Sequence, residues 1–457
     1  MHTKHTMKWS AALAAVAATA MLLAGCTPGS GQSSSGSTDK PTKITTDVAS
    51  LGKLTLTVWD QETTPGISTS LDDLNKQFEA KYPNVHIDRV VRSGSDLRTT
   101  LKLALSSSTP PDVIQANQGF ADMAAYVKAG LLTDLGPYAS RYGWTKRFPS
   151  SQRALDSVTP DGSKLGSGNL YGLSITGEMV GTFYNKKVLD SVGLPVPKSM
   201  EELEADLPKI KAKGILPIAF GDQDKSPAVH LLGIALMPQL GQKAASQLIF
   251  HQAGTFDSPS VHTAADLLAG WATKGYVTPG FNGVNSNTAA TAFGQGKAAF
   301  FLGGVWNQDA IQKAGAGDSG AGFTVLPQKA GDPLVAMGGV GMGWAIPARS
   351  KKKDAAAAYI DFISSAKGMT TLEKNNQLPA VPSADAKAEE GTLTNDILST
   401  WSRLTKDNGL VAYMDWSTPT FYDTIVSNVQ SLMGGTENTA AFTKALQADY
   451  SGFGGGN

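Results

Sequence analysis

Apolar and polar residues follow two different periods along this chain. Residues 54–59 alternate between apolar and polar, which predicts a β-strand, while Leu71, Leu74 and Phe78 recur at helical spacing and predict a helix over 69–82. Further strands are expected over 86–91, 112–114, 170–176, 182–185, 215–220, 298–302, 323–326 and 342–346. Further helices are expected over 97–105, 120–127, 199–213, 229–240, 261–274, 288–295, 352–365, 395–404, 421–433 and 439–450. This alternation predicts an α/β fold whose mostly parallel sheet is covered by helices on both faces.

The first 26 residues follow neither period. Lys4 and Lys8 precede an apolar run over 11–23, and small residues lead to Cys26, the single cysteine of the chain. This pattern is typical of an export signal, and the run is shorter than the about twenty residues of a membrane span. It resembles a bacterial lipoprotein signal, which implies that residues 1–25 are a signal peptide and that the Cys26 sulfur carries a diacylglyceryl anchor at the extracytoplasmic face of the cell membrane. The alternative is an ordinary secreted protein with a leftover thiol.

The two ends of the mature chain are poor in apolar residues. Residues 26–50 are rich in Gly, Ser, Thr and Pro and are expected to form a flexible tether, and residues 451–457 are expected to form a disordered tail. The 457 residues exceed what one core holds, because single cores stop growing at about 250 to 300 residues. We therefore expect two lobes.

Charge and cysteine content exclude several kinds of function. Lys plus Arg and Asp plus Glu both number 39, so no net field draws the protein to nucleic acid. A single cysteine, expected to be lipidated, leaves no thiol for a disulfide, a thiol catalyst or a cysteine metal site.

Polar side chains follow the first and third expected strands. The carboxyl ends of parallel strands share one edge of a sheet, and open α/β sheets bind ligands at that edge. From the residues alone, these side chains either line a site or are solvated loop residues. They are Gln61, Glu62, Gln115, Asn117 and Gln118.

Glu178 lies in a non-polar stretch at the expected first crossing between lobes. A carboxylate in such surroundings must find partners, because an unpaired buried charge is very unfavourable. It either serves a ligand or has a structural role at the hinge.

Several residues in the second half of the chain are candidates for ligand contact. Trp306 follows the turn-forming pair Gly303 and Gly304, and a ring in that position either fills the core or lines a cleft. The glycines around Gly339 suggest close approach of the backbone, either to a ligand or between hinge strands. The other candidates are Asp222 and Asp224, which precede a helix that contains His230, and Trp416 in a loop before the helix at 421–433.

Motifs for other chemistry are weak or absent. The loop at 317–320 imitates a trypsin-like protease but has no histidine in a suitable setting, and the histidines lack zinc spacing. The sequence at 294–297 lacks the spacing of a phosphate-binding loop. We therefore expect no catalytic residue, no metal and no cofactor.

Several motifs occur together in a recognisable order. They are 111–113, 129–135, Tyr171-Gly172-Leu173, Tyr184-Asn185-Lys186 and 296–300 leading into Gly304-Val305-Trp306. In this order, over about residues 54 to 450, the chain resembles the extracellular solute-binding proteins of family 1, the sugar receptors of ABC importers. The segment at 415–419 resembles the oligosaccharide receptors within that family.

The resemblance implies a type II periplasmic-binding-protein-like fold, with two lobes joined by hinge strands and a ligand cleft between them. It implies lobe 1 over 51–176 with 327–371, and lobe 2 over 177–326 with 372–450. It favours ligand contact for Glu62, Gln115, Asn117, Glu178 and Trp306. Ser226 replaces an aromatic residue that relatives often place there, which leaves the size and pose of the ligand open.

The sequence thus predicts a lipoprotein that binds a short oligosaccharide between two closing lobes. Flat aromatic rings suit the CH faces of a sugar, and short polar groups suit its hydroxyls. The resemblance implies a monomer that delivers its ligand to an ABC permease served by a cytoplasmic ATPase. The alternatives are a receptor of the same fold for a peptide or polyol, and a surface glycoside hydrolase that uses an acid pair.

Overall fold

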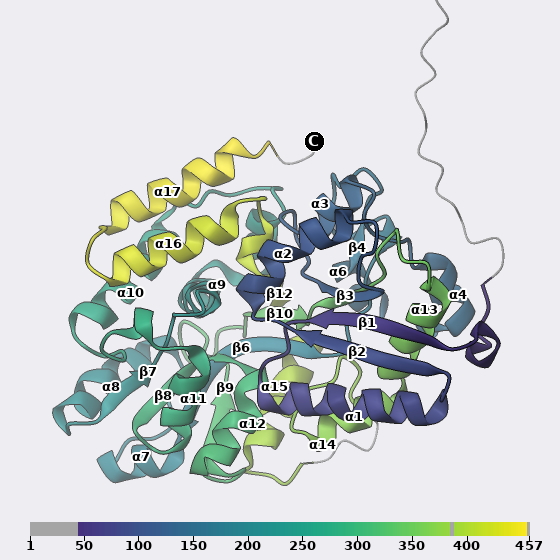
Figure 1. The fold of residues 1–457 in the computed structure, drawn as a ribbon. Coiled ribbons are helices and arrows are strands. Elements are labelled where there is room, and N and C mark those ends of the chain that lie inside the picture. Colours follow the sequence, from purple (N-terminus) through teal and green to yellow (C-terminus); the bar gives the residue numbers. More distant parts are fainter. Residues whose placement is uncertain (1–43, 384–387, 455–457) are drawn as a thin grey trace, which may run out of the picture. The chain divides into compact units, whose positions relative to one another are not determined.

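The computed structural model describes residues 44–383 and 388–454 (Figure 1). The expected signal peptide, the lipidation site Cys26 and most of the expected tether lie outside these residues. Within 44–383 and 388–454, no helix is long and apolar enough to cross a membrane.

The first sheet has the strand order β11-β3-β1-β2 and is mostly parallel, as predicted. The central strand β1 (Leu54–Asp60) runs parallel to β2 (Val85–Val91) and to β3 (Val113–Ala116), and β11 (Gly343–Ala345) is antiparallel to β3. Leu56 and Val58 of β1 are fully buried. The polar residues that follow β1 and β3 therefore lie at the same edge of the sheet.

Helices cover this sheet on both faces, as α1 and α2 show (Figure 1). Phe78 of α1 packs with Trp344 and Tyr359 on one face, and Leu101 of α2 packs with Ile114 on the other. The helices of this part are α1 (Pro65–Lys81), α2 (Gly94–Ser106), α3 (Met123–Lys128), α4 (Gly136–Tyr142), α5 (Trp144–Arg147), α6 (Ser150–Leu155), α13 (Lys353–Ile363) and α14 (Ala366–Lys374). A separate hairpin joins β4 (Ser157–Val158) and β5 (Asn169–Leu170).

The second sheet has the strand order β12-β10-β6-β8-β7, with β9 also paired to β6. Its strands are β6 (Gly177–Asn185), β7 (Leu216–Ala219), β8 (Ala298–Gly304), β9 (Ala321–Thr324), β10 (Ala336–Val340) and β12 (Leu410–Val411). The parallel pairing expected from the first set of strands does not extend to this sheet. The central strand β6 is antiparallel to β8, β9 and β10, and only the outer pairs β7 with β8 and β10 with β12 are parallel.

The helices of the second part pack a separate core in which Leu232, Phe300 and Phe421 are buried. They are α7 (Lys186–Val192), α8 (Met200–Ala212), α9 (Ser226–Ile249), α10 (Pro259–Thr273), α11 (Ser286–Gly294), α12 (Gln308–Ile311), α15 (Leu393–Lys406), α16 (Phe421–Met433) and α17 (Thr439–Gly452). Short single turns are η1 (Val48–Leu51), η2 (Phe281–Gly283), η3 (Val305–Asn307), η4 (Gln312–Ala316) and η5 (Met414–Trp416).

Local signals in the sequence set several helix ends. The Ser199 hydroxyl accepts from the backbone N–H of Glu202, while the Glu202 carboxylate accepts from the N–H of Lys198, which confirms the predicted start of α8. The helix predicted to end at Leu240 instead continues to Ile249 as α9, after a break at Gly241, where φ is 73°.

Two terminal segments are more ordered than the sequence suggested. Residues 44–50 of the expected tether belong to the folded part, because Val48 is buried and its carbonyl accepts from the Asn84 side chain. Residues 451–453 of the expected tail also have fixed contacts, since α17 reaches Gly452 and the Phe453 ring lies 4.9 Å from that of Phe120. Each segment is held by a few apolar contacts. These are too few to produce a periodic pattern in the sequence.

Two further expectations need correction. Residues 170–176, expected to be extended, form a strand only at β5 and otherwise make single bridges, from Leu173 to Trp344 and from Thr176 to Pro379. The expected lobe boundary put β10 in lobe 1, but β10 pairs with β6 in the second sheet. Its glycines allow this pairing, since a Cβ on Gly338 would lie 2.2 Å from the Glu178 carbonyl oxygen.

Candidate functional site

A cavity of about 310 Å³ opens where the strand ends of the two sheets face each other. The first sheet contributes the loops after β1 and β3, and the second contributes β6, the end of β8, the start of α9 and the loop around η5. Of the eleven residues predicted to bind ligand, nine line it: Gln61, Glu62, Gln115, Asn117, Gln118, Glu178, Asp224, Trp306 and Trp416.

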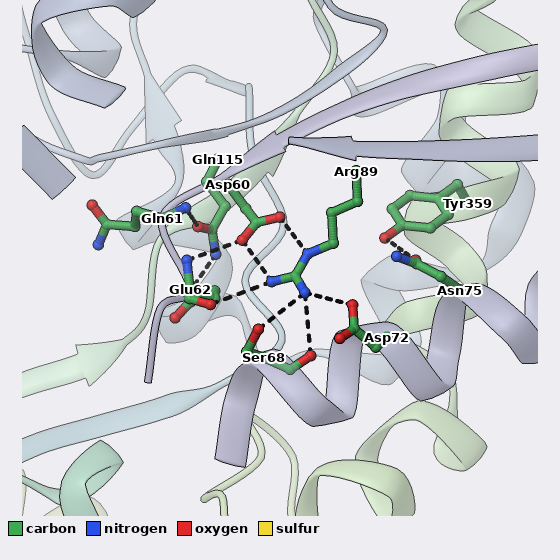
Figure 2. A network of polar contacts seen from close by, with 9 residues as sticks. All are labelled: Asp60, Gln61, Glu62, Ser68, Asp72, Asn75, Arg89, Gln115 and Tyr359. Carbon is green, nitrogen blue, oxygen red and sulfur yellow. Dashed lines mark hydrogen bonds and ion pairs between the residues drawn. The ribbon is translucent and has the colours of Figure 1, made fainter. Parts of the chain in front are cut away.

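Arg89 holds the loop after β1 in place, as Figure 2 shows. Its guanidinium donates to both carboxylate oxygens of Asp60, at 2.7 and 2.8 Å, and to Asp72 at 2.8 Å. Asp60 is fully buried, so this ion pair compensates a charge that would otherwise be very unfavourable. Arg89 also donates to the backbone carbonyl of Glu62, and Asp60 accepts from the Glu62 N–H. The network therefore fixes the backbone that carries Glu62.

Gln115 of β3 aligns the Glu62 side chain (Figure 2). Its amide nitrogen donates to Glu62 Oε1 at 2.6 Å, and its amide oxygen accepts from the Gln61 N–H at 3.0 Å. Burial raises the pKa of Glu62 from 4.5 to about 7. The loop after β1 and the end of β3 therefore lie side by side, as predicted.

Glu178 enters the cavity from β6, in the second sheet. The Tyr413 hydroxyl donates to its Oε2 at 3.1 Å. Burial, followed by the nearby charge of Glu62, raises the pKa of Glu178 to about 8. Two carboxyl groups from different sheets thus influence each other in one cavity.

Aromatic rings form the wall beside Glu178. The ring centroid of His230 lies 5.1 Å from that of Trp306 and 5.9 Å from that of Tyr413. A Cβ on Gly304 would lie 2.1 Å from the Trp306 ring, so the glycine before η3 lets the indole fold back over the strand end. Burial lowers the pKa of His230 to about 4 and keeps the imidazole neutral. This wall offers flat apolar faces to a ligand.

Trp416 has a different environment from Trp306. Its side chain is buried and packs against Gly119, and its carbonyl accepts from the Phe120 N–H at 3.4 Å. Gly119 has φ of +90°, and a Cβ there would lie 2.9 Å from the Trp416 Cα. Trp416 therefore lines the cavity while it joins the two lobes.

Gln118 and Asn117 are held by carboxyl groups, of which that of Asp122 lines the cavity and that of Asp156 does not. Gln118 donates to Asp156 and to the Gly341 carbonyl, both at 2.8 Å, and Asn117 donates to Asp122 at 3.2 Å. Burial raises the pKa of Asp156 to about 6.

Asp224, Asp222 and Gly339 are the predicted residues at the edge of the cavity or outside it. Asp224 lines the cavity and accepts from the Ser286 N–H at 2.7 Å. Asp222 does not line it, because its carboxylate accepts from the Ala228 N–H at the start of α9 and from Gln430. Gly339 does not line it either, since it pairs with Glu178 in the sheet and its open side faces Leu155.

The lining residues that were not identified from the sequence include Arg98, Tyr413 and Tyr422. Arg98 of α2 forms a salt bridge with Asp122 at 2.9 Å and lies 4.3 Å from the ring centroid of Tyr422 on α16. This contact spans the two lobes. Tyr413 adjoins the 415–419 segment noted above, which is the one local signal that could have indicated it.

The site holds carboxylates, amides and aromatic rings, but among residues 44–383 and 388–454 no group of three His, Cys, Asp or Glu side chains could bind a metal ion. Two sheets, each with its own helices, and a cavity between their strand ends define the two-lobe fold of type II solute-binding proteins.

Comparison with known proteins agrees with this class. A model of the bacterial extracellular solute-binding protein family matches residues 62–370, and the chain belongs to that family. This is a family of binding proteins that act outside the cytoplasm.

Individual relatives are distant but extend over most of the chain. An uncharacterised ABC transporter extracellular-binding protein of Pyrococcus horikoshii is 24% identical over 367 residues, which cover 78% of this chain and 77% of the relative. The multiple sugar-binding protein of Streptococcus mutans is 23% identical over 370 residues, which cover 79% and 80%. Among solved structures, a chitin oligosaccharide binding protein superposes with a TM-score of 0.77 at 22% identity, over 88% of this chain and 98% of that one.

Proposed function

We propose that this protein is the lipid-anchored receptor of an ABC importer that binds a short oligosaccharide and delivers it to a membrane permease. The observation that carries the proposal is the cavity itself, in which Glu62 and Gln115 of one lobe face Trp306 of the other. An indole ring suits the CH face of a pyranose, while a carboxylate and an amide suit neighbouring hydroxyls.

The names of similar proteins support a sugar as the ligand. The Streptococcus mutans relative is named a multiple sugar-binding protein, and the structural neighbour binds chitin oligosaccharide by name. Both matches extend over at least 79% of this chain.

Closure of the lobes is the proposed mechanism of capture. The chain passes between the two parts of the fold just before β6 and just after β10, and Gly339 of β10 pairs with Glu178 at the cavity. Contacts such as that of Gly119 with Trp416 form when the lobes meet. A ligand that bridges the walls stabilises this closed form by its differential affinity for it.

The anchor is the part of the proposal that depends on the sequence alone. Cleavage before Cys26 and diacylation of its sulfur would hold the receptor beside its permease, with residues 27–43 as the connection to the body. Globomycin-sensitive processing and loss of membrane association in Cys26→Ser would support it. Unchanged membrane association of Cys26→Ser would contradict the anchor and leave the ligand proposal intact.

A panel of neutral disaccharides and trisaccharides tests the ligand class. A bound sugar at a hundredfold excess over its Kd raises the free energy of unfolding by about 2.7 kcal/mol, which a thermal-shift assay detects. The comparison variant is Trp306→Ala, in which the stabilisation is expected to fall to about half or less at the same sugar concentration. A shift produced by peptides or polyols but by no sugar would favour the non-sugar receptor. Release of products from a bound sugar would indicate a hydrolase.

A further inference from the structure

The charges that line the cavity are unbalanced. Five carboxyl groups line it, from Glu62, Asp122, Glu178, Asp224 and Asp415, but among the described lining residues the one guanidinium is that of Arg98 and there is no lysine. A neutral ligand would leave the excess of carboxyl groups over basic groups unchanged. An anionic ligand would be repelled.

Arg98 does not neutralise the two glutamates at the centre. Its guanidinium is bound to Asp122 at 2.9 Å and covers the Tyr422 ring at 4.3 Å. The next arginine, Arg89, is paired with Asp60 and Asp72 behind the loop and reaches only the backbone carbonyl of Glu62. Within the part of the chain that the structure describes, no basic side chain forms a salt bridge with Glu62 or Glu178.

The two glutamates also have spare hydrogen-bonding capacity. The Glu62 carboxylate accepts from Gln115 through Oε1, and the Glu178 carboxylate accepts from Tyr413 through Oε2. Among the hydrogen bonds of the described residues, neither second oxygen has a protein donor, although both side chains line the cavity. Burial raises the pKa of both groups, and the charge of Arg89 offsets this rise only in part at Glu62.

The aromatic wall provides a second, independent indication. The rings of Trp306 and Tyr413 flank His230, which lines the cavity. The neutral imidazole cannot balance the carboxylates, whereas the faces of Trp and Tyr rings attract cations. Carboxylates on one side and aromatic faces on the other suit an ammonium group.

We infer that the ligand carries a positively charged amine that enters between Glu62 and Glu178, against the rings of Trp306 and Tyr413. The ligand class is therefore a basic amino sugar, such as an oligosaccharide with a free amine in place of an N-acetyl group. This inference rests on the proposed function, because it assumes that a sugar occupies the cavity.

Matched sugars that differ only in the charge of the amine test the inference. Calorimetric titration compares the free-amine and N-acetylated forms of the same disaccharides and trisaccharides, in the gluco and galacto series, alongside the neutral panel. We expect the free-amine form to bind at least about tenfold more tightly. Equal or tighter binding of the neutral or acetylated sugars would overturn the inference and leave the sugar receptor standing. If no sugar of any kind binds, the proposed function fails and the inference fails with it.

Variants of the two glutamates locate the amine. In Glu178→Gln and Glu62→Gln, we expect the affinity for the free-amine sugar to fall at least about tenfold, while the affinity for its acetylated partner changes by less than about threefold. Glu204→Gln, an exposed residue of α8 outside the cavity, is the matched control. Equal losses for both sugars in the glutamate variants would contradict an amine at this position.

Proton release gives a measurement that needs no variant. The groups that face the two glutamates are Asp60, Arg89, Tyr413 and the neutral His230. At pH 6 the empty site holds protons on Glu62 and Glu178, and an ammonium group that ionises one of the two carboxyl groups releases about one proton to the buffer. Titration in buffers of different ionisation enthalpy measures this number. A value of zero for the free-amine sugar would overturn the inference.

Discussion

Gly119 and Trp416 approach so closely that no side chain fits between them. A Cβ on Gly119 would lie 2.9 Å from the Trp416 Cα and 3.0 Å from its ring, and the Phe120 N–H next to it donates to the Trp416 carbonyl. The two residues come from opposite walls of the cavity. The two walls can therefore meet only if residue 119 has no side chain.

Gly119→Ala is expected to weaken ligand binding by about tenfold, because the added methyl group separates the lobes around the ligand. Gly130→Ala is the matched control. Both glycines have positive φ, +90° and +66°, so both variants carry backbone strain of about 1 kcal/mol, but a Cβ on Gly130 meets nothing within 4 Å. Calorimetric titration with a sugar that binds measures the loss of affinity, and urea unfolding measures the loss of stability. Equal affinities in the two variants would show that the contact plays no part in closure.

The contribution of Glu178 to the stability of the empty protein should fall as the pH rises from about 4.5 to 8. The pKa of Glu178 is about 8 in the folded protein and 4.5 ordinarily, so in this window the folded state binds the proton more tightly than the unfolded state does. The contribution of Glu178 to the free energy of unfolding is therefore fully present below pH 4.5 and is lost as the pH rises toward 8. Glu178→Gln keeps an acceptor for Tyr413 but cannot ionise.

At pH 8 we expect the Glu178→Gln protein to exceed the wild type in the free energy of unfolding by on the order of 2 kcal/mol, and at pH 5 to match it. Urea unfolding at both pH values measures the difference. The exposed Glu390 provides the control substitution to Gln. A difference that is the same at pH 5 and pH 8 would rule out titration of Glu178 as its cause.

Trp306→Ala is expected to reduce sugar affinity by about tenfold or more, because it removes the ring face that stacks on the sugar. Gly304→Ala tests the same ring without deleting it, since its Cβ would lie 2.1 Å from the indole and displace it. Gly283→Ala is the matched control, with nothing within 4 Å of the added carbon. Calorimetry would contradict the stacking role if Gly304→Ala and Gly283→Ala bound sugar equally well.

Arg89→Met is expected to lower the free energy of unfolding by about 3 kcal/mol, because it leaves the fully buried Asp60 without its cation. The variant should also weaken ligand binding, since Arg89 fixes the backbone that carries Glu62. Lys76→Met removes a surface pair, 3.9 Å from Asp73, and should change stability by less than about 1 kcal/mol. Similar urea midpoints for the two variants would refute the importance of the network.

Local patterns in the sequence were sufficient for much of the first sheet and its ligand edge. The alternation at β1 and the polar residues after β1 and β3 placed Glu62 and Gln115 together, because parallel strands end at one edge. Pattern alone could not show that β6 would be antiparallel to three neighbours, since apolar alternation carries no strand direction.

Contacts between distant segments were the part that the sequence could not reveal. Arg98 and Tyr422 are more than 300 positions apart and meet only because both lobes fold. Asp222 was expected at the site because it follows a strand, as Asp224 does, but it is bound by the N–H of Ala228 and by Gln430. A two-residue difference in a turn decides which carboxylate faces the cavity, and periodicity does not resolve it.

The position of Trp306 gives the protein an optical reporter of its own. Most of its other tryptophans are shielded from solvent, as the exposures of Trp144 and Trp344 at 0%, Trp271 at 2% and Trp416 at 3% show. Trp306 and Trp59 are only partly covered, and of these two Trp306 lines the cavity where the lobes meet. A solute that displaces water from its indole should shift the emission of the whole protein, so occupancy can be followed by intrinsic fluorescence without any label.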